Sequence, residues 1–225
     1  KKISDDIKSE ISQKVTVRKQ GNKKIPHLAI ILIGDDGASQ TYVDNKVKAC
    51  KSVGFHYTMM RFADTISEER LMKHIDHVNN DDDVDGFIVQ LPLPNHISVE
   101  NITEKIRSDK DVDGFHPVNV GRMLQGLPGF VPATPHGIML LLKHYKIDTK
   151  GKHAVVVGRS NIVGRPMSVL LSSNSNPGNC TVTICHSQTK NIKDFCLQAD
   201  IIVAALGIPE FLKADMVKEN AVVID

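Results

Sequence analysis

The sequence predicts an α/β protein with two parallel sheets, one in each half of the chain. Apolar runs such as residues 28–33 and 201–206 are typical of strands that are covered on both faces of a parallel sheet. Segments with apolar residues at helical spacing alternate with these runs. A glycine-containing stretch, residues 158–164, directly follows another apolar run, as a tight turn follows a buried strand. We expect one domain over residues 1–132 and a second over residues 133–225.

Composition and charge exclude several classes of protein. The 225 residues suffice for two modest domains, and 41% hydrophobic with 24% charged residues is typical of a globular protein in water. The net charge is only +2 and no long basic run occurs, so we expect no nucleic-acid partner. No apolar run approaches the length of a membrane span, and the first residues do not resemble a signal peptide. We therefore expect no membrane partner and a cytoplasmic location.

Cysteine and histidine spacing argues against a metal centre. None of the four cysteines forms a C-x-x-C pair, which favours reduced thiols inside a cytosolic protein. His74 and His77 are three residues apart on a predicted helix, but no cysteine or carboxylate cluster accompanies them. We interpret this pair as part of a solvated helix face and predict no metal site.

The first half is predicted to alternate helices and strands as a small parallel α/β unit. Ile3 and Ile7 begin a series at helical spacing, and Gly21 would end that helix. Ser39 is positioned to cap the second helix, which Gly54 would end. The expected elements are a helix over residues 1–20, a strand over 27–33, a helix over 39–53, a strand over 55–62, a helix over 67–79, a strand over 84–90 and a helix over 98–106.

The second half is predicted to begin after a long connection. Residues 107–135 contain many glycines and prolines, which is typical of a loop-rich segment. A helix is expected to begin at Thr134 and Pro135 and to end near Leu142. Strand and helix segments then alternate as in a Rossmann-type domain. The predicted strands cover residues 153–157, 181–185, 200–205 and 221–225.

The turn after the strand at 153–157 carries the main binding signal of the second half. Gly158 can adopt a backbone conformation that a side chain would forbid, and Gly164 would let the next helix pack close to the strand. Pro166 suits the first turn of that helix, where backbone N–H groups and the helix dipole favour an anion. The glycines lack the G-x-G-x-x-G spacing, so the pattern alone fits a nucleotide site and a plain α/β turn equally well.

The end of the following strand indicates which nucleotide would bind. NAD sites usually have an acidic residue here that holds a ribose hydroxyl, whereas NADP sites have groups that meet a phosphate. This chain has Ser187 and Thr189 at that place and no acid, and Arg159 leaves the glycine turn. These residues favour NADP as the cofactor.

Candidate catalytic residues lie in the first half. Tyr42 and Lys46 are four residues apart on the same predicted helix and therefore share a face. A lysine in a dry site beside a phenol can do acid–base work, although the spacing also fits a solvated lysine. Gln90 ends the third strand, where it either orients a polar partner or caps the sheet edge. Asp113 lies in a glycine-containing turn, where aspartate often has only a local role.

Ligands of open parallel sheets bind outside the carboxyl ends of the strands. This rule groups residues 34–46, 90–94 and 109–116 of the first half, and residues 158–164, 186–189 and 206–209 of the second. We expect the two sets of strand ends to face each other across a cleft that holds the ligands.

Taken together, these motifs resemble the bifunctional methylenetetrahydrofolate dehydrogenase/cyclohydrolase family over nearly the whole chain. The motifs that carry the resemblance are, in order, Tyr42 to Cys50 with Gly54, Val89 to Pro94, Lys110 to Phe115, Asn119 to Arg122, Pro132 to Gly137, Gly158 to Pro166, and Cys185 to Ser187. Ordered motifs at these spacings are specific as a set. The chain departs from the family at Ala133, where a cysteine is usual, and at His136 and Gln188, where basic residues are common.

The resemblance implies a two-step reaction on a tetrahydrofolate derivative, in an N-terminal catalytic domain joined to a C-terminal NADP-binding domain. Methylenetetrahydrofolate would be oxidised with NADP to methenyltetrahydrofolate, which would then be hydrolysed to formyltetrahydrofolate. The resemblance also implies a homodimer, formed through the second domain. Relatives continue beyond a strand like that at 223–225 into a further helix, so we expect this chain to lack a C-terminal part and to be weak or inactive alone.

The resemblance implies a role for each candidate residue. Lys46 would be the central acid–base residue, Tyr42 would lie at the pterin side and help to position it, and Gln90 would hold it in its working orientation. Asp113 would bind the polar edge of the pterin. The residues expected to hold NADP are Gly158, Arg159, Ser160, Gly164 and Ser187, with Arg159 and Ser187 near the ribose phosphate.

Three other functions are compatible with parts of the pattern. A shikimate-dehydrogenase-like enzyme would share the two-domain layout and the cofactor turn, without needing Tyr42, Lys46, Gln90 and Asp113 as a set. A nucleotide-sensing module would bind NADP without catalysis. A dehydrogenase that lacks cyclohydrolase activity would use the same motifs for one step only.

Overall fold

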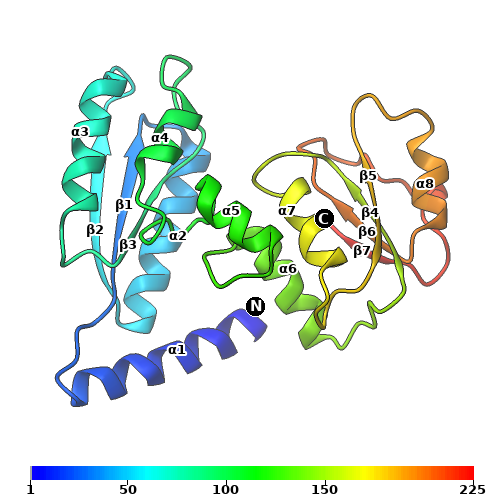
Figure 1. Cartoon of the computed structure of the whole chain (residues 1–225), viewed down its shortest axis with the longest axis horizontal. Helices are drawn as coiled ribbons and strands as arrows, with labels where there is room; N and C mark the ends of the chain where they lie inside the picture. Colours follow the sequence, from blue (N-terminus) through cyan, green and yellow to red (C-terminus); the bar gives the residue numbers. More distant parts are fainter. Residues whose placement is uncertain (1) are drawn as a thin grey trace. The chain divides into compact units, whose positions relative to one another are not determined.

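The structure is a computed structural model that describes residues 2–225, so the first residue of the predicted opening helix lies outside the described residues. The chain divides into two compact units, Lys1–Val118 and Asn119–Asp225, and each is built around its own parallel sheet (Figure 1). This arrangement confirms the predicted fold class of two parallel-sheet α/β units. The predicted domain boundary between residues 132 and 133, and the predicted cleft, stay predictions.

The first unit has three parallel strands in the order β2-β1-β3. Every element predicted here is present within two residues of its expected bounds, because each apolar run and each capping residue acts locally. The elements are α1 (Lys2–Gln20), β1 (His27–Ile33), α2 (Gly37–Val53), β2 (His56–Phe62), α3 (Glu68–Asn79), β3 (Gly86–Val89) and α4 (Val99–Lys105).

β1 lies at the centre of the first unit, and its side chains are buried on both faces of the sheet. Ile31 packs with Leu71 of α3 and Ile102 of α4 in one core. Ile30 packs with Val43 of α2 in a core on the opposite face. Helices therefore cover both faces, which is why the sequence of β1 is apolar throughout instead of alternating (Figure 1).

The start of α2 corrects one expectation. Asp36, and not Ser39, is the N-cap, because the Asp36 carboxylate accepts a hydrogen bond of 2.8 Å from the backbone N–H of Ser39. Ser39 lies inside the helix and is buried. Gly54 ends the helix with a φ of 84°, as predicted.

The second unit has four parallel strands in the order β5-β4-β6-β7. Ile138 of α6 and Met167 of α7 pack with Val156 on one face of this sheet. Cys196 of α8 packs with Val155 on the other face. The elements are α6 (Ala133–His144), β4 (His153–Val157), α7 (Gly164–Ser172), β5 (Thr181–Cys185), α8 (Ile192–Gln198), β6 (Ile201–Ala204), the 3₁₀ turn η1 (Ala214–Met216) and β7 (Val222–Ile224).

The connection over residues 107–135 is not all loop. It contains a helix, α5 (Pro117–Leu124), which the sequence did not predict. Pro117 occupies the first position of this helix, where the missing N–H costs nothing, and Gly121 lies in its interior. Both residues usually mark loops, so the pattern concealed the helix.

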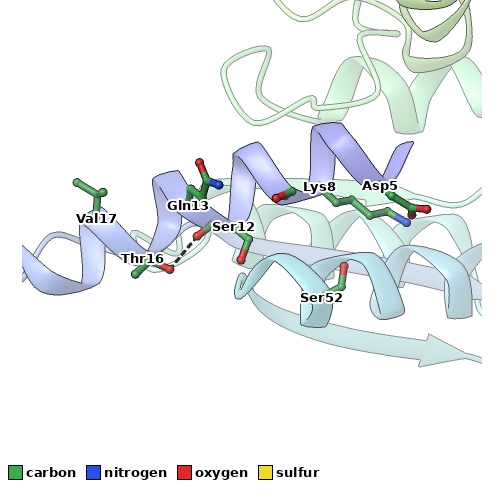
Figure 2. Close-up of a pocket in the computed structure, with 8 residues that line it drawn as sticks. Asp5, Lys8, Ser12, Gln13, Thr16, Val17 and Ser52 are labelled. Carbon is green, nitrogen blue, oxygen red and sulfur yellow. Dashed lines mark hydrogen bonds between the residues drawn. The ribbon is translucent and has the colours of Figure 1, made fainter. Parts of the chain in front are cut away.

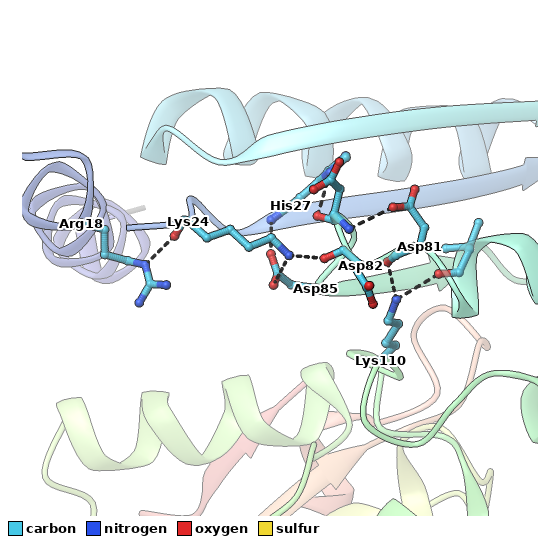
Figure 3. A network of polar contacts seen from close by, with 9 residues as sticks. Arg18, Lys24, His27, Asp81, Asp82, Asp85 and Lys110 are labelled. Carbon is cyan, nitrogen blue, oxygen red and sulfur yellow. Dashed lines mark hydrogen bonds and ion pairs between the residues drawn. The ribbon is translucent and has the colours of Figure 1, made fainter. Parts of the chain in front are cut away.

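A polar latch fixes the amino end of the central strand in the first unit (Figure 3). The backbone N–H of His27, the first residue of β1, donates to Asp85 Oδ2 at 2.8 Å. The imidazole Nε2 of His27 lies 2.9 Å from Thr58 Oγ1 on β2. Lys24 Nζ pairs with Asp85 Oδ1 at 2.9 Å. The latch thus joins β1 to its neighbours on both sides.

The second unit repeats this latch with the same residue types, although its lysine precedes β7 and not the central strand β4. The backbone N–H of His153, the first residue of β4, donates to Asp200 Oδ2 at 2.8 Å. His153 Nε2 lies 2.9 Å from Thr183 Oγ1 on β5, and Lys218 Nζ pairs with Asp200 Oδ1 at 2.7 Å. The two sheets therefore begin their central strands by the same device.

We expect Asp200→Asn to destabilise the second unit by about 1 kcal/mol, because it removes the charge that Lys218 and the His153 N–H contact in a partly exposed pair. Hydrogen bonds from Lys218 and then from His153 lower the pKa of the Asp200 carboxyl. A carboxyl of this kind stabilises above its unfolded-state pKa and loses that contribution as the pH falls through its folded-state pKa. The difference in urea midpoint from wild type should therefore be present at neutral pH and shrink below about pH 4.

A matched control for the latch is Asp215→Asn, which breaks an exposed ion pair with Lys193. Exposed pairs contribute little, so this variant should keep the wild-type urea midpoint. A loss of stability in Asp200→Asn that is the same at every pH would contradict the electrostatic account of the latch.

Candidate functional site

α2 and β3 bring two of the predicted site residues into contact. Lys46 lies in α2, and Gln90 directly follows β3. Lys46 Nζ donates a hydrogen bond of 2.9 Å to Gln90 Oε1, across 44 residues of sequence. The lysine is therefore not a freely solvated side chain, which was the simpler interpretation of its spacing.

The Gln90 amide has a fixed orientation. Its Nε2 donates to the carbonyl of Leu91 at 2.6 Å, and its backbone N–H donates to the carbonyl of Ile31 in β1 at 2.9 Å. Oε1 consequently faces Lys46 as an acceptor. A neutral acceptor can hold a lysine amine in both its charged and its neutral form, whereas a carboxylate would favour the charged form strongly. The pair is suited to a lysine that gains and loses a proton.

Asp113 adds an acidic group that interacts electrostatically with Lys46. Burial raises the pKa of the Asp113 carboxyl, the charge of Lys46 opposes this, and the charge of Asp111 adds to it, so that the pKa is raised overall. Asp113 lines a small cavity together with Phe87 and Phe115. A partly buried carboxyl of this kind can hydrogen-bond the polar edge of a heterocycle.

Tyr42 lies one turn before Lys46 on α2. Its side chain is 65% exposed, and within residues 2–225 no hydrogen bond joins its hydroxyl to Lys46. The structure therefore places Tyr42 on the same helix face without binding it to the lysine. An exposed aromatic ring at this position is available to stack on a flat ligand.

Two charged residues that sequence reasoning did not single out hold the loop of Asp113. Lys110 is 8% exposed and Asp111 is 2% exposed. Both belong to a motif that carries the family resemblance, but their burial depends on tertiary packing, and spacing does not reveal it. Their contacts are described below.

In the second unit, the turn after β4 requires both of its glycines. Gly158 has a φ of 128°, and a Cβ there would lie 2.3 Å from the carbonyl oxygen of Ala205. A Cβ on Gly164 would lie 2.3 Å from the carbonyl oxygen of Gly158. The obstructing atoms are backbone atoms, which cannot move aside cheaply. The predicted close packing of α7 against the strand is therefore confirmed.

Ser160 has a structural task that the sequence did not reveal. Its Oγ accepts from the N–H groups of Val163 at 3.1 Å and Gly164 at 3.3 Å, and its carbonyl accepts from Arg165 N–H at 3.0 Å. These N–H groups at the start of α7 are the ones expected to bind an anion. Because Ser160 already satisfies these three N–H groups, they are not available to a phosphate in this conformation.

Arg159 and Ser187 offer side chains to a phosphate instead. They follow β4 and β5, which are paired neighbours, so both lie at the carboxyl edge of the sheet. Both are exposed, and neither makes a hydrogen bond or ion pair with any residue in the described part of the chain. Thr189 differs, because its hydroxyl accepts from His186 N–H at 2.9 Å and closes the turn. A guanidinium and a hydroxyl that are both unpaired, at the same edge of the sheet, are groups of the kind that bind a ribose phosphate.

Other hollows of the first unit contain none of the candidate residues. α1 and Ser52 of α2 line a shallow groove (Figure 2). A second hollow lies around His27 and Thr58, at the amino end of the sheet. Unlike these two hollows, the cavity at Asp113 includes a predicted site residue.

Metal-binding and membrane-spanning features are reported for the described residues only. Residues 2–225 contain no group of three or more histidine, cysteine or acidic side chains placed to hold a metal ion. None of the helices in that range combines the length and the apolar character needed to cross a bilayer. The four cysteines are free and buried, and burial raises the pKa of each thiol.

Comparisons with known proteins agree with the division of the chain. The sequence model of the tetrahydrofolate dehydrogenase/cyclohydrolase catalytic domain matches residues 1–113, and that of its NAD(P)-binding domain matches residues 132–225. The bifunctional protein FolD of Cytophaga hutchinsonii is 57% identical over 222 residues, which are 99% of this chain and 77% of that protein.

Two solved structures extend the comparison. The bifunctional enzyme FolD from Campylobacter jejuni has a TM-score of 0.95 and 47% identity, over 100% of this chain and 78% of that chain. The Trypanosoma brucei dehydrogenase-cyclohydrolase, complexed with NADP cofactor and inhibitor, has a TM-score of 0.92 and 32% identity, over 98% of this chain and 75% of that one. On these matches, the chain belongs to the tetrahydrofolate dehydrogenase/cyclohydrolase family, and its second unit carries the NAD(P)-binding domain.

Proposed function

We propose that this protein oxidises methylenetetrahydrofolate with NADP and then hydrolyses the methenyl product to formyltetrahydrofolate. The observation that carries the proposal is the hydrogen bond between Lys46 and an orientation-fixed Gln90, in a chain of this family. A lysine that only faces solvent would not need a partner such as Gln90, whose amide is itself held in place by hydrogen bonds. A proton-transferring lysine does need one, because it must stay in place while its charge changes.

The oxidation step needs the cofactor site of the second unit. When bound, NADP⁺ supplies an acceptor for the hydride that leaves the methylene carbon of the folate. Gly158 and Gly164 shape the turn, Ser160 holds the start of α7, and Arg159 and Ser187 hold the ribose phosphate. No proton transfer accompanies hydride departure, so this chain contributes binding and orientation to the step.

The hydrolysis step uses Lys46. Water adds to the methenyl carbon, which already carries positive charge, and the neutral amine of Lys46 takes the proton that the water releases. The hydroxyl on this carbon then loses its proton as its oxygen forms the formyl C=O, and the bond from the carbon to one ring nitrogen breaks. The electron pair of that bond stays on the nitrogen, which takes up a proton. One formyl group and one net proton result. Gln90 holds the lysine throughout, and a neutral amide tolerates both of its charge states.

Tyr42 and Asp113 bind the substrate in this proposal. The exposed Tyr42 ring stacks on the flat pterin, one turn from Lys46. The Asp113 carboxyl, with its raised pKa, hydrogen-bonds the polar edge of the pterin. Together they bring the reactive carbon near the lysine amine.

We also propose that the protein works in the cytoplasm as a homodimer, without nucleic-acid or membrane partners. Buried, free thiols fit a reducing compartment, and a net charge of +2 without a basic run fits the absence of a nucleic-acid surface. Light scattering on the purified full-length protein measures the oligomeric state directly.

The proposed function is tested by the choice of substrate. Purified full-length protein is mixed with NADP and either methylenetetrahydrofolate or shikimate, and NADPH absorbance is followed. We expect NADPH with the folate alone. NADPH with shikimate alone would favour the shikimate-dehydrogenase-like alternative and refute the proposal.

We expect Arg159→Ala to raise the KM for NADP by about tenfold or more and to leave the KM for NAD nearly unchanged, because only NADP carries the phosphate that the guanidinium meets. Arg165→Ala is the matched control, because Arg165 is also exposed but its guanidinium bonds Asn161 in the turn that precedes α7. Steady-state kinetics with both nucleotides decide the question. An equal rise in both KM values would argue that Arg159 supports the turn and not the phosphate.

A further inference from the structure

We propose that Lys110 and Asp111 are positioning residues for the folate reaction, because they lock the loop that presents Asp113. The inference rests on the proposed function and extends it to two side chains that face away from solvent. Lys110 bonds backbone carbonyls and Asp111 bonds backbone N–H groups of the loop, so we assign each an effect through Asp113.

Lys110 anchors the loop by an unusual means, a buried cation. Its Nζ donates to the carbonyl of Val78 at 3.1 Å and to that of Asp81 at 2.6 Å. These carbonyls lie in the last turn of α3 and just beyond it, at the negative end of the helix dipole. Each also accepts a backbone hydrogen bond, Val78 from Asp81 N–H and Asp81 from Val84 N–H. Within residues 2–225, no carboxylate forms an ion pair with Lys110. Burying a charged ammonium costs free energy, and here its hydrogen bonds to the two carbonyls, which hold the loop in place, offset that cost.

The Asp111 side chain holds the part of the loop that follows Asp113. One carboxylate oxygen accepts from Gly114 N–H at 3.1 Å, and the other accepts from His116 N–H at 2.9 Å. Gly114 has a φ of 72°, which a side chain would resist. The backbone is therefore held immediately before and immediately after Asp113.

The loop is also attached to β3, the strand that ends at Gln90. Phe87 N–H donates to the Lys110 carbonyl at 2.9 Å, and Phe87 forms a parallel bridge with Asp111. Val112 packs so closely on the strand that a Cβ on Gly86 would lie 2.3 Å from its Cγ1. One strand thus fixes both the Gln90 amide that holds Lys46 and the loop that carries Asp113.

Lys24 provides a matched control on the same turn (Figure 3). Like Lys110, it reaches the segment between α3 and β3, where its Nζ donates to the Asp82 carbonyl at 2.6 Å and to Asp85 Oδ1 at 2.9 Å. Its side chain is 44% exposed, and it belongs to the latch of β1 and not to the Asp113 loop. Removing its charge perturbs the same turn without releasing Asp113.

The test compares Lys110→Met and Lys24→Met in the full-length protein. For Lys110→Met we expect kcat/KM for methylenetetrahydrofolate to fall about tenfold, with a raised folate KM and an unchanged NADP KM. Lys24→Met should keep all three constants within about twofold. A merely structural role of Lys110 would lower the amount of folded enzyme and leave the folate KM unchanged, and that result would overturn the proposal.

A double-mutant cycle with Asp113→Asn shows whether Lys110 acts through Asp113. In the Asp113→Asn background, Lys110→Met should change kcat/KM by less than about twofold, since the group that it positions has already lost its charge. A full tenfold loss in that background would overturn the proposal. If Lys110→Met does not fold, Asp111→Asn replaces it in the double-mutant cycle with Asp113→Asn. This substitution removes the carboxylate that bonds the Gly114 and His116 N–H groups while keeping the size of the side chain.

The wild type separates failure of this inference from failure of the proposed function. A wild type without NADPH formation from the folate would refute the proposed function and this inference with it. An active wild type whose Lys110→Met and Asp111→Asn variants keep the wild-type folate KM would refute this inference alone.

Discussion

Lys46→Met is expected to lower the rate of methenyltetrahydrofolate hydrolysis by about a thousandfold, because general acid–base groups contribute rate factors of this order. Methionine keeps the length of the side chain but cannot donate to Gln90 or carry a proton. NADPH formation from methylenetetrahydrofolate should persist in part, since hydride departure needs no proton acceptor. Supplying methenyltetrahydrofolate directly and following its absorbance measures the hydrolytic step alone.

The matched control for this variant is Lys48→Met. Lys48 lies on the same helix and is exposed, and its side chain forms no hydrogen bond or ion pair with any residue of the described chain. It should hydrolyse methenyltetrahydrofolate at the wild-type rate. If Lys46→Met and Lys48→Met behaved alike, the acid–base role of Lys46 would be wrong.

Gly164→Ala is expected to have the second large effect. Its Cβ would lie 2.3 Å from the Gly158 carbonyl oxygen and 2.8 Å from the Arg159 backbone nitrogen, so the turn after β4 must open. We expect the second unit to lose about 2–3 kcal/mol of unfolding free energy, the usual cost of overpacking, and NADP affinity to fall by at least about tenfold. Urea unfolding and an NADP titration measure the two effects.

The control for this substitution is Gly137→Ala in α6, where no atom lies within 4 Å of the added Cβ. Alanine favours a helix interior over glycine, so this variant should be as stable as wild type or slightly more stable. Unchanged NADP binding in Gly164→Ala would show that the close contact between turn and helix is not needed for the cofactor site.

Much of the fold follows from local patterns. β1 and β4 are apolar on both faces, and such runs are hard to mistake for anything but central strands. α5 was not predicted because proline and glycine usually indicate a loop. Pro117 is tolerated because it is the first residue of the helix, and Gly121 lies in the helix interior. The latches of His27 and His153 were not predicted either, since each joins residues that lie far apart in sequence and meet only when the sheet forms.

The sequence predicted which residues belong to the candidate site, but not which contacts they make. The family resemblance implied that Gln90 holds Lys46, but the spacing of the residues alone did not, because their contact depends on how α2 lies against β3. Ser160 was assigned to the cofactor, yet its Oγ is engaged by the N–H groups of Val163 and Gly164. Spacing identifies a hydroxyl and cannot show whether the backbone already uses it. The burial of Lys110 is likewise a property of packing.

The most direct test of the central claim follows two absorbances in one sample of full-length enzyme with methylenetetrahydrofolate and NADP. Our account predicts that NADPH accumulates while the methenyl intermediate stays low in the wild type, and that the intermediate builds up in Lys46→Met as NADPH still forms. A wild type that produces NADPH but leaves the methenyl intermediate unhydrolysed would contradict the account, because one enzyme would then perform only the first of the two steps.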